Sequence, residues 1–215
     1  RSELVEEGID ILFIRELVGD IYFGEHSTVV ENGKRVARDV AEYTEDQVSS
    51  VARIAFESAQ KRRKKVSSVD KANVLDTSKL WRTVVDEVAK DYPDIELEHV
   101  LVDNCAMQLI KKPSQFDVVL TPNMFGDILS DAAAVLPGSL GVMASASMNQ
   151  NGFAMFEPPG GSAQDIAGLG IANPIAQILS AAMMLRFSFA MNREADAIEQ
   201  AIEKTLEQGF RTGDI

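Results

Sequence analysis

Short, largely apolar runs along the chain predict the strands of a sheet. Ile9–Ile14 and Phe116–Leu120 are typical of strands that are buried on both faces. Lys65–Val74 is expected to form a strand that runs into a loop, and another strand is expected near Leu97–Val102. The segments between these runs have a different periodicity.

Apolar residues spaced three and four apart predict helices between the strands. One helix is expected from Thr44 to about Arg63, because Thr44 and Gln47 have the spacing of a capping box at a first turn. Ser78 is expected to cap a second helix. The apolar faces of these two helices consist of Val48, Val51, Ala52, Ala55, Ala59, Trp81, Val84, Val85 and Val88.

More helices are expected in the second half of the chain. Pro122 suits the start of a helix with the sequence NMFGDILSDAAAVL. Two further helices are predicted at about Pro174–Ala190 and Arg193–Gln208. Strands that alternate with helices indicate an α/β architecture in which helices cover both faces of a sheet.

A hairpin interrupts this alternation within residues 26–40. Asn32-Gly33 is the residue pair preferred in two-residue turns between antiparallel strands. The sequence therefore predicts two antiparallel strands across Thr28–Val40, which together form an arm.

The character of the chain changes after Pro137. Glycine, serine and methionine dominate the stretch LPGSLGVMASASMNQNG, and a glycine-rich loop follows it. We therefore expect a domain boundary near Pro137–Gly141, which divides the chain into residues 1–138 and 139–215.

Composition narrows the choice of partners. Hydrophobic residues make up 46% of the chain and charged residues 25%, as in ordinary globular proteins. The formal net charge of -12 repels nucleic acid and anionic membrane surfaces, so we expect neither as a partner. The basic run Lys61–Lys65 is expected to be a solvated helix end that complements the helix dipole.

The single cysteine, Cys105, excludes an internal disulfide and favours a reducing compartment such as the cytoplasm. No stretch of the sequence is long and apolar enough to span a membrane. The first residues look like the middle of a domain, so we expect the chain to be truncated.

Three aspartates are the first candidates for chemistry. On a helix, Asp127 and Asp131 would share one face, where their charges repel unless a cation lies between them. Asp103 follows a predicted strand, where such residues often face an active-site crevice. Three carboxylates suit a hard divalent cation such as Mg²⁺ or Mn²⁺. The alternative is a solvated helix face and an unrelated aspartate.

Two cationic side chains lie at expected strand ends. Lys71 ends an apolar strand beside Asn73, and burial favours the neutral amine of a lysine, which can act as a general base. Arg15 ends another strand and could hold a carboxylate through two hydrogen bonds, with Tyr22 nearby as a proton donor. The alternatives are a lysine that reaches solvent, an ordinary ion pair and a core tyrosine.

The glycine-rich loop Gly160–Gly170 is the last candidate. Its glycines would allow close approach to a phosphate, and the helix after Pro174 would offer an N-terminus. The loop does not have the GxGxxG pattern of the usual dinucleotide fold, so a flexible turn is the alternative.

Taken in order, these segments resemble the β-decarboxylating dehydrogenases, a family that acts on isopropylmalate, isocitrate, homoisocitrate and tartrate or malate. The IYFG ending of the first motif and the GGSA form of the loop resemble the isopropylmalate branch rather than the isocitrate branch. The resemblance covers essentially the whole chain and implies a two-domain fold with an incomplete cofactor domain. The matching motifs are RELVGDIYFG, SVDKANVL, VDNCAMQL, NMFGDILSDAAA, GSLGVMASASM and EPPGGSAQDIAGLGIANP.

The resemblance implies a reaction and the roles of several residues. The reaction is NAD-linked oxidative decarboxylation of 3-isopropylmalate to 4-methyl-2-oxopentanoate and CO₂, in leucine biosynthesis. Arg15 and Val74 would bind the substrate. Tyr22 would donate a proton, and Lys71 would act as the base in the active site of the partner subunit of a homodimer.

The same resemblance implies a shared metal site and a cofactor site. Asp103 of one subunit would join Asp127 and Asp131 of the other around Mg²⁺ or Mn²⁺. The carboxylate of Asp165 would accept hydrogen bonds from ribose hydroxyls and repel a 2′-phosphate, which favours NAD over NADP. The cofactor positions that match are Asn73, Glu157, Gly160, Gly161, Ser162, Ala163, Asp165 and Asn173.

The chain departs from the family pattern in three ways. Gln164 replaces a proline before Asp165, and Asp20 stands where a glycine is common. The initial segment of the family, which carries further substrate arginines, is missing, as is the stretch after Ile215. The alternatives are a sister enzyme acting on tartrate, D-malate or homoisocitrate, an inactive dimerisation fragment, and a Mg²⁺-dependent phosphoryl-transfer enzyme built on the three aspartates.

Overall fold

The structure is a computed structural model that describes residues 8–149 and 151–215. The chain forms two compact units, one ending at Ala132 and the other beginning at Ala133. This division lies shortly before the expected boundary after residue 138. The tasks assigned to the two domains remain predictions.

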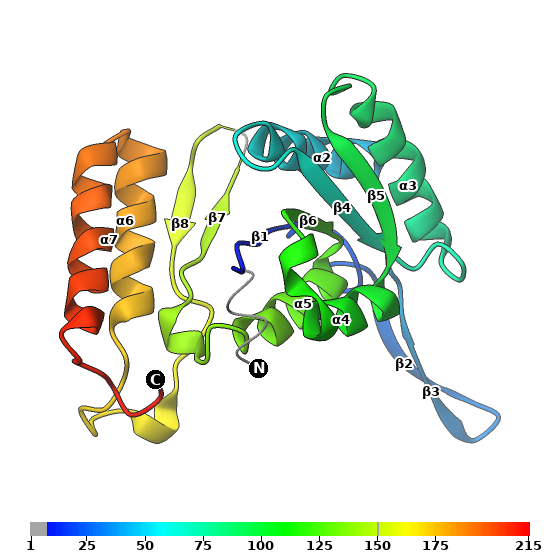
Figure 1. Cartoon of the computed structure of the whole chain (residues 1–215). Coiled ribbons are helices and arrows are strands. Elements are labelled where there is room, and N and C mark those ends of the chain that lie inside the picture. The colour runs from blue at the N-terminus through cyan, green and yellow to red at the C-terminus, as the bar shows by residue number, and fades with distance from the viewer. Residues whose placement is uncertain (1–7, 150) are drawn as a thin grey trace. The chain divides into compact units, whose positions relative to one another are not determined.

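A parallel sheet forms the centre of the first unit (Figure 1). Within the described residues its strand order is β1-β6-β4-β5, and its strands are β1 (Leu12–Arg15), β4 (Lys65–Asp70), β5 (Glu96–Leu101) and β6 (Val118–Thr121). The predicted run at Phe116–Leu120 thus supplies a central strand. Because every pairing is parallel, the carboxyl ends of all four strands lie at one edge of the sheet.

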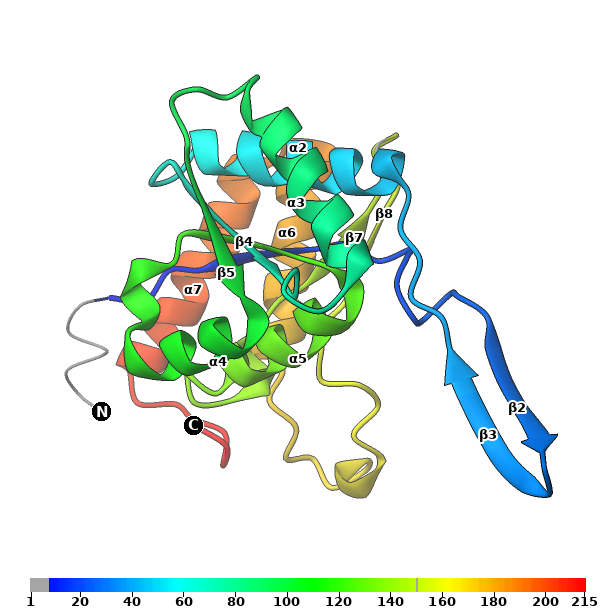
Figure 2. The same ribbon diagram turned by 90° about the vertical axis from the view of Figure 1, so that its right-hand side faces the viewer.

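Helices lie on both faces of this sheet (Figure 2). On one side are α2 (Glu45–Gln60) and α3 (Asp76–Ala89). On the other are α4 (Val102–Lys111), followed in the chain by the 3₁₀ turn η1 (Pro113–Gln115), and α5 (Asn123–Ala134). The predicted α/β architecture with a covered sheet is therefore confirmed.

The core lies between the sheet and the pair α2 and α3. Trp81 is fully buried there, its Nε1 donates to Ser68 Oγ at 3.1 Å, and its ring meets that of Tyr43 edge to face at 5.6 Å between centroids. Each buried Val or larger apolar side chain stabilises such a core by roughly 1.5–3 kcal/mol. All the predicted apolar positions of both helices are buried: Val48, Val51, Ala52, Ala55, Ala59, Trp81, Val84, Val85 and Val88.

Of the two predicted helix caps, only the first is confirmed. Thr44 caps α2 in a capping box, with Gln47 N donating to Thr44 Oγ1 at 3.3 Å and Thr44 N donating to Gln47 Oε1 at 2.8 Å. The prediction for Ser78 is wrong, because α3 begins two residues earlier, at Asp76. The Ser78 hydroxyl is buried and accepts a hydrogen bond from Lys71 N at 3.0 Å, so it ties the loop after β4 to α3.

The helix-dipole part of the prediction for the basic run Lys61–Lys65 is also wrong, although Lys61, Arg63 and Lys64 are exposed as expected. It follows the end of α2, and its side chains bind the amino ends of the strands rather than a helix terminus. Arg62 donates to Asp117 at 2.8 Å and to Asp10 at 2.7 Å, and Lys65 pairs with Glu98 at 2.8 Å. The Asp117 side chain is almost fully buried, and a buried carboxylate needs such a cation.

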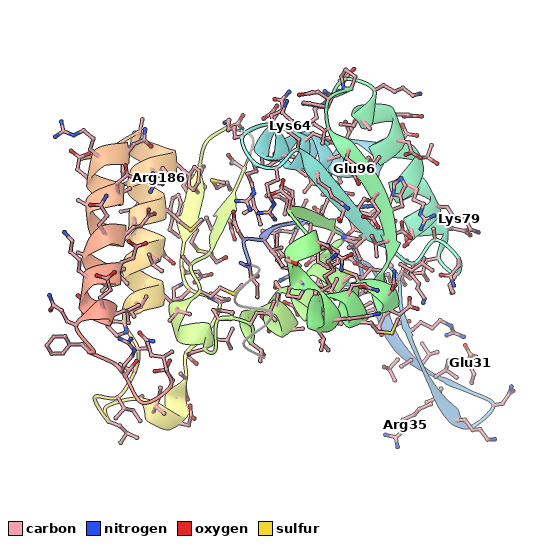
Figure 3. The ribbon with its side chains drawn as sticks, in the orientation of Figure 1. Glu31, Arg35, Lys64, Lys79, Glu96 and Arg186 are labelled. Carbon is pink, nitrogen blue, oxygen red and sulfur yellow. The ribbon has the colours of Figure 1, made fainter. Side chains whose placement is uncertain are left out.

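The basic run makes two further contacts of this kind. Arg63 donates to the carbonyl of Phe116, and Lys64 pairs with Asp94 at 3.0 Å. Lys64 and Glu96 lie at the same end of the first unit (Figure 3). This cluster therefore joins the amino edge of the sheet, opposite the edge with the carboxyl ends.

The predicted arm is confirmed as a hairpin of β2 (His26–Glu31) and β3 (Lys34–Asp39). Asn32 and Gly33 form its turn with φ angles of 50° and 76°, which suit an asparagine and a glycine. The hairpin extends away from the sheet, with Glu31 and Arg35 near its tip (Figures 1 and 3).

The second unit combines a short hairpin with two helices. β7 (Ala146–Met148) and β8 (Ala154–Phe156) are antiparallel, and α6 (Ile175–Phe189) packs against α7 (Asn192–Glu207). Arg186 of α6 pairs with Asp196 at 2.9 Å and Glu199 at 2.7 Å on α7 (Figure 3). Two 3₁₀ turns complete the unit, η2 (Leu140–Val142) and η3 (Gln164–Ile166).

Candidate active site

The predicted catalytic side chains of the first unit lie at the carboxyl edge of the sheet. Arg15 is the last residue of β1, and Lys71 directly follows β4. Asp103 lies in the first turn of α4, directly after β5, and α5 with Asp127 follows β6. Ligands of parallel α/β sheets bind at this edge, so the topology supports the predicted site.

Arg15, Tyr22 and Asp127 form one cluster. Arg15 Nη1 donates to Asp127 Oδ1 at 2.7 Å, and the Tyr22 hydroxyl donates to Asp127 Oδ2 at 2.8 Å. The Arg15 guanidinium also lies 5.6 Å from the centre of the Tyr22 ring. The Asp127 side chain is 46% exposed, so a ligand could reach these groups.

Tyr22 is held in its protonated form by this cluster. The hydrogen bond to the Asp127 carboxylate is the main cause that raises the pKa of Tyr22 above its ordinary value of 10. A tyrosine that keeps its proton at neutral pH can donate that proton to a substrate.

Asn123 is a member of this cluster that the sequence analysis missed. Its Oδ1 accepts from Arg15 Nε at 3.0 Å and from Arg15 Nη2 at 2.7 Å, and its Nδ2 donates to Gly19 O at 3.2 Å. The residue is 2% exposed, so its amide is held in place by its surroundings and fixes the orientation of the Arg15 guanidinium. An asparagine directly after a proline at a helix start was the available signal.

Gly126 leaves the space through which Arg15 crosses α5. A Cβ atom at this position would lie 2.2 Å from Thr121 Oγ1 and 2.7 Å from Arg15 Cγ. Only a glycine therefore allows Arg15 to reach Asn123 and Asp127 along this path.

Lys71 and Asp103 form a second cluster. Lys71 Nζ lies 2.5 Å from Asp103 Oδ1, and this contact is the main cause that lowers the pKa of Asp103. The preceding Asp70 is fully buried and accepts from Arg82 at 2.5 Å. Arg82 and Ser78 thus hold the backbone that presents Lys71.

Asn73 and Val74 lie in the exposed turn after Lys71. Val74 N donates to Lys71 O at 2.9 Å, and the Val74 side chain is 64% exposed. The turn exposes an apolar side chain shortly after Lys71, and the contact of Val74 with a substrate stays a prediction.

The three predicted metal ligands do not meet within one chain. Among the residues that the structure describes, no group of three or more His, Cys, Asp or Glu could hold a metal ion. Asp127 binds Arg15 and Tyr22, Asp103 binds Lys71, and Asp131 is exposed on α5. The prediction of a site shared between two subunits therefore stays a prediction.

The predicted cofactor residues of the second unit line an open loop. Glu157, Ser162 and Asp165 are exposed, and a Cβ atom at Gly160 or Gly161 would meet nothing within 4 Å. Ala163 has a φ of 40° and leads into η3, which begins with Gln164. This open surface leaves room for a nucleotide to approach the backbone.

Asn173 is fixed beside this loop by the last residues of the chain. Its Oδ1 accepts from Ile175 N at 3.0 Å, and its Nδ2 donates to Asp214 Oδ2 at 3.1 Å. Asp214 also accepts from Ser139, and the hydrogen bonds from Ser139 and Asn173 help to lower the pKa of Asp214 to about 2. The tail after α7 therefore positions a predicted cofactor residue.

Comparison with known proteins assigns the chain to a family. The family model of isocitrate/isopropylmalate dehydrogenase matches residues 1–215. The chain belongs to this family. Among the helices in the described part of this chain, none is long and apolar enough to cross a membrane.

Individual relatives cover the whole chain but extend beyond it. The 3-isopropylmalate dehydrogenase of Clostridium pasteurianum is 56% identical over 100% of this chain and 60% of its own length. That of Aquifex aeolicus is 58% identical over 100% of this chain and 59% of its own length. A crystal structure of isocitrate dehydrogenase from Methylococcus capsulatus is 40% identical with a TM-score of 0.89, over 95% of this chain and 60% of that chain. The chain thus spans about three fifths of these family members.

Proposed function

We propose that this chain is part of an NAD-dependent enzyme that oxidises and decarboxylates 3-isopropylmalate to 4-methyl-2-oxopentanoate and CO₂, in leucine biosynthesis. The proposal rests above all on the cluster of Arg15, Tyr22 and Asp127 at the carboxyl edge of the sheet. Relatives named 3-isopropylmalate dehydrogenase, at 56% and 58% identity, favour this substrate. The lone buried thiol suits a reducing cytoplasm.

Arg15 and Val74 fit an anionic substrate with an apolar branch, in a chain whose net charge is -12. Arg15 binds the carboxylate of the malate portion through its fork of donors, because Asn123 holds the guanidinium plane. Val74, exposed next to the Lys71 turn, contacts the isopropyl group. Both residues therefore position the substrate between the two clusters.

The donor atoms present fit a divalent cation and NAD. The carboxylates of Asp103, Asp127 and Asp131 are the oxygen ligands that Mg²⁺ and Mn²⁺ prefer. Asp165 in η3 suits the ribose hydroxyls of NAD. When bound, the cation would supply stabilisation of negative charge on the substrate oxygen, and the nicotinamide would supply a hydride acceptor. The loop positions that would hold NAD are Glu157, Gly160, Gly161, Ser162, Ala163, Asp165 and Asn173, with Asn73 at the nicotinamide end.

The residues of the chain itself move the protons. Lys71, once it has separated from Asp103 and lost its own extra proton to solvent, takes the proton of the substrate 2-hydroxyl as C2 of the substrate is oxidised. Tyr22 then donates its proton to the carbon that has lost its carboxylate as CO₂. The raised pKa of Tyr22 keeps this proton available at neutral pH.

We propose further that the enzyme is a homodimer with shared active sites. Each chain neutralises its own candidate ligands in two separate clusters, Arg15 with Asp127 and Lys71 with Asp103. In a dimer, Lys71 and Asp103 of one subunit would face Arg15 and Asp127 of the other. The cation would then bind between carboxylates that the single chain keeps apart.

The test of the reaction is an assay of the intact protein that contains this sequence. With NAD and Mn²⁺, we expect NADH and CO₂ to form from 3-isopropylmalate much faster than from D-malate, tartrate or homoisocitrate. A preference for one of these other acids would show that the proposed substrate is wrong. Phosphatase activity without NAD would show that the proposed reaction class is wrong. A parallel assay of the 215-residue chain tests whether this part is active alone.

Subunit mixing tests the shared site. Lys71→Ala and Asp127→Ala should each abolish activity, because each removes one half of every active site. After the two variants are denatured together and refolded, half of the dimers should be mixed, and each mixed dimer has one intact site. Activity should then return to about a quarter of the wild-type value. No recovery in demonstrably mixed dimers would contradict sharing.

A further inference from the structure

Asp20 adopts an unusual backbone conformation in a buried place. Its φ is 69°, in the left-handed region that favours glycine, and only 7% of the residue is exposed. A buried carboxylate in such a conformation persists only where specific contacts stabilise it.

The Asp20 carboxylate makes those contacts with the start of α5. Its Oδ2 accepts from Met124 N at 3.1 Å and from the Tyr43 hydroxyl at 3.4 Å, and its Oδ1 accepts from Ile21 N at 2.9 Å. The Tyr43 hydroxyl in turn accepts from Asn123 N at 2.8 Å. Asp20 and Tyr43 therefore satisfy the first two N–H groups of α5, which have no partner within a helix.

The same helix start carries the residues that hold Arg15. Asn123 accepts two hydrogen bonds from Arg15, and Asp127 accepts one from the opposite side of the guanidinium. A change in the position or order of this first turn would move both acceptors. The contacts thus run from Asp20 through α5 to the guanidinium of Arg15.

We propose that Asp20 and Tyr43 form a clamp on the N-terminus of α5, and that Asp20 is a positioning residue for substrate binding by Arg15. The clamp is inferred from contacts that do not involve a ligand. Its effect on substrate binding depends on the proposed function. A carboxylate suits this place because it accepts several hydrogen bonds at once and lies at the positive end of a helix dipole.

The local geometry explains why an aspartate can stand here. Asp and Asn tolerate left-handed backbone better than other residues with a side chain. The Asp20 backbone is also held, because its N–H donates to Glu42 O at 3.1 Å. The conformation therefore aims the carboxylate at α5 instead of at solvent.

The experiment compares the intact protein with Asp20→Gly, Asp20→Asn and Tyr43→Phe. Glycine adopts this φ freely, so Asp20→Gly removes the carboxylate without adding backbone strain. We expect hydrogen exchange of the Met124 and Asn123 amides to become about tenfold faster, and KM for 3-isopropylmalate to rise about fivefold with kcat nearly unchanged. Asp20→Asn keeps a carbonyl acceptor, so its amide exchange rates and its KM should lie much closer to the wild-type values. Tyr43→Phe should speed exchange at Asn123.

Asp39→Asn is the matched control. Asp39 lines the same hollow of about 430 Å³ as Asp20 and Tyr43, but its carboxylate pairs with His26 of the arm. This variant should leave both amides and KM unchanged. Either of two results would refute a positioning role for Asp20. In the first, Asp20→Gly changes neither amide exchange nor KM. In the second, it speeds amide exchange without raising KM. If the wild-type protein does not turn over 3-isopropylmalate, the proposed function fails, and amide exchange still tests the clamp.

Discussion

Asp127 accepts a hydrogen bond on each of its carboxylate oxygens, one from Arg15 and one from Tyr22. These two donors hold the carboxylate in place, and each also has a proposed role toward the substrate. A cation that binds Asp127 competes with both donors. The protonation of Tyr22 is therefore coupled to the charge at Asp127.

This coupling gives a prediction for the pH titration of Tyr22. Because the pKa of Tyr22 is raised above 10, its hydroxyl should stay protonated at neutral and mildly alkaline pH and ionise only above pH 10. Asp127→Asn removes the negative charge, so the pKa should fall toward 10. NMR of protein labelled at the tyrosine ring carbons measures this shift. Asp131→Asn, on the same helix, should leave Tyr22 unchanged, and an unshifted Tyr22 in Asp127→Asn would refute the coupling.

Single residues were predictable from sequence only where local pattern defines their place. Arg15 and Lys71 stand out because Arg15 is the last residue of β1 and Lys71 directly follows β4. The signal for Asn123 was weaker, an asparagine after a proline at a helix start, and the contacts of Asn123 with Arg15 and of Asp20 with Met124 join residues about a hundred positions apart. The carboxylate of Asp20 could be understood only after the start of α5 was placed next to it.

Among the elements, the tail after α7 has a role that its sequence does not suggest. Asp214 binds both Asn173, at the start of α6, and Ser139, just before η2. The last residues, RTGDI, have neither strand nor helix periodicity. In the structure this segment is instead a brace that holds Asn173 and Ser139 beside the predicted cofactor loop.

The brace should depend on pH in one direction. Its contribution to stability is fully present above the ordinary aspartate pKa of 3.8 and is lost as the pH falls through the folded value of about 2. NMR titration of the Asp214 carboxyl carbon should give that low value, and Ser139→Ala should raise it toward 3.8. Ser147→Ala, in β7, is the control and should have no effect. A wild-type value near 3.8 would mean that the tail is not bound in solution.

Sequence patterns located most elements well, because their signals are short-range. The arm and the capping box of α2 depend on residues a few positions apart, and both are confirmed. Ser78 and the basic run Lys61–Lys65 were misassigned for the opposite reason. Their decisive partners, Lys71 N and Asp117, come from other elements, so a cap and a helix-dipole contact were the only local interpretations.

At the scale of the whole molecule, Cys105 reports on the integrity of the first unit. Its thiol is fully buried, and burial raises its pKa to about 12. The native protein should therefore react very slowly with a thiol reagent such as dithionitrobenzoate at pH 8, because the reactive thiolate is scarce and inaccessible. In guanidinium chloride, one thiol per chain should react within seconds to minutes. Prompt reaction of the native protein would show that the buried face of α4, which carries Cys105, is not packed in solution.

The sheet as a whole was predictable, but the assembly of its site was not. Alternating strands and helices imply a parallel sheet, and a parallel sheet implies that Arg15, Lys71 and Asp103 share an edge. Which of them pair within one chain depends on side-chain geometry. Whether a second chain completes the cation site is a question about assembly, on which periodicity carries no information.

The two edges of the sheet have different tasks. Ion pairs of Arg62, Lys64 and Lys65 fasten the edge where the strands begin, and the acids and bases of the proposed reaction occupy the edge where they end. Mutations can therefore accumulate in the loops where the strands end, while the ion pairs where the strands begin stay intact. Such a division of labour allows a lineage to change its substrate without first losing its fold.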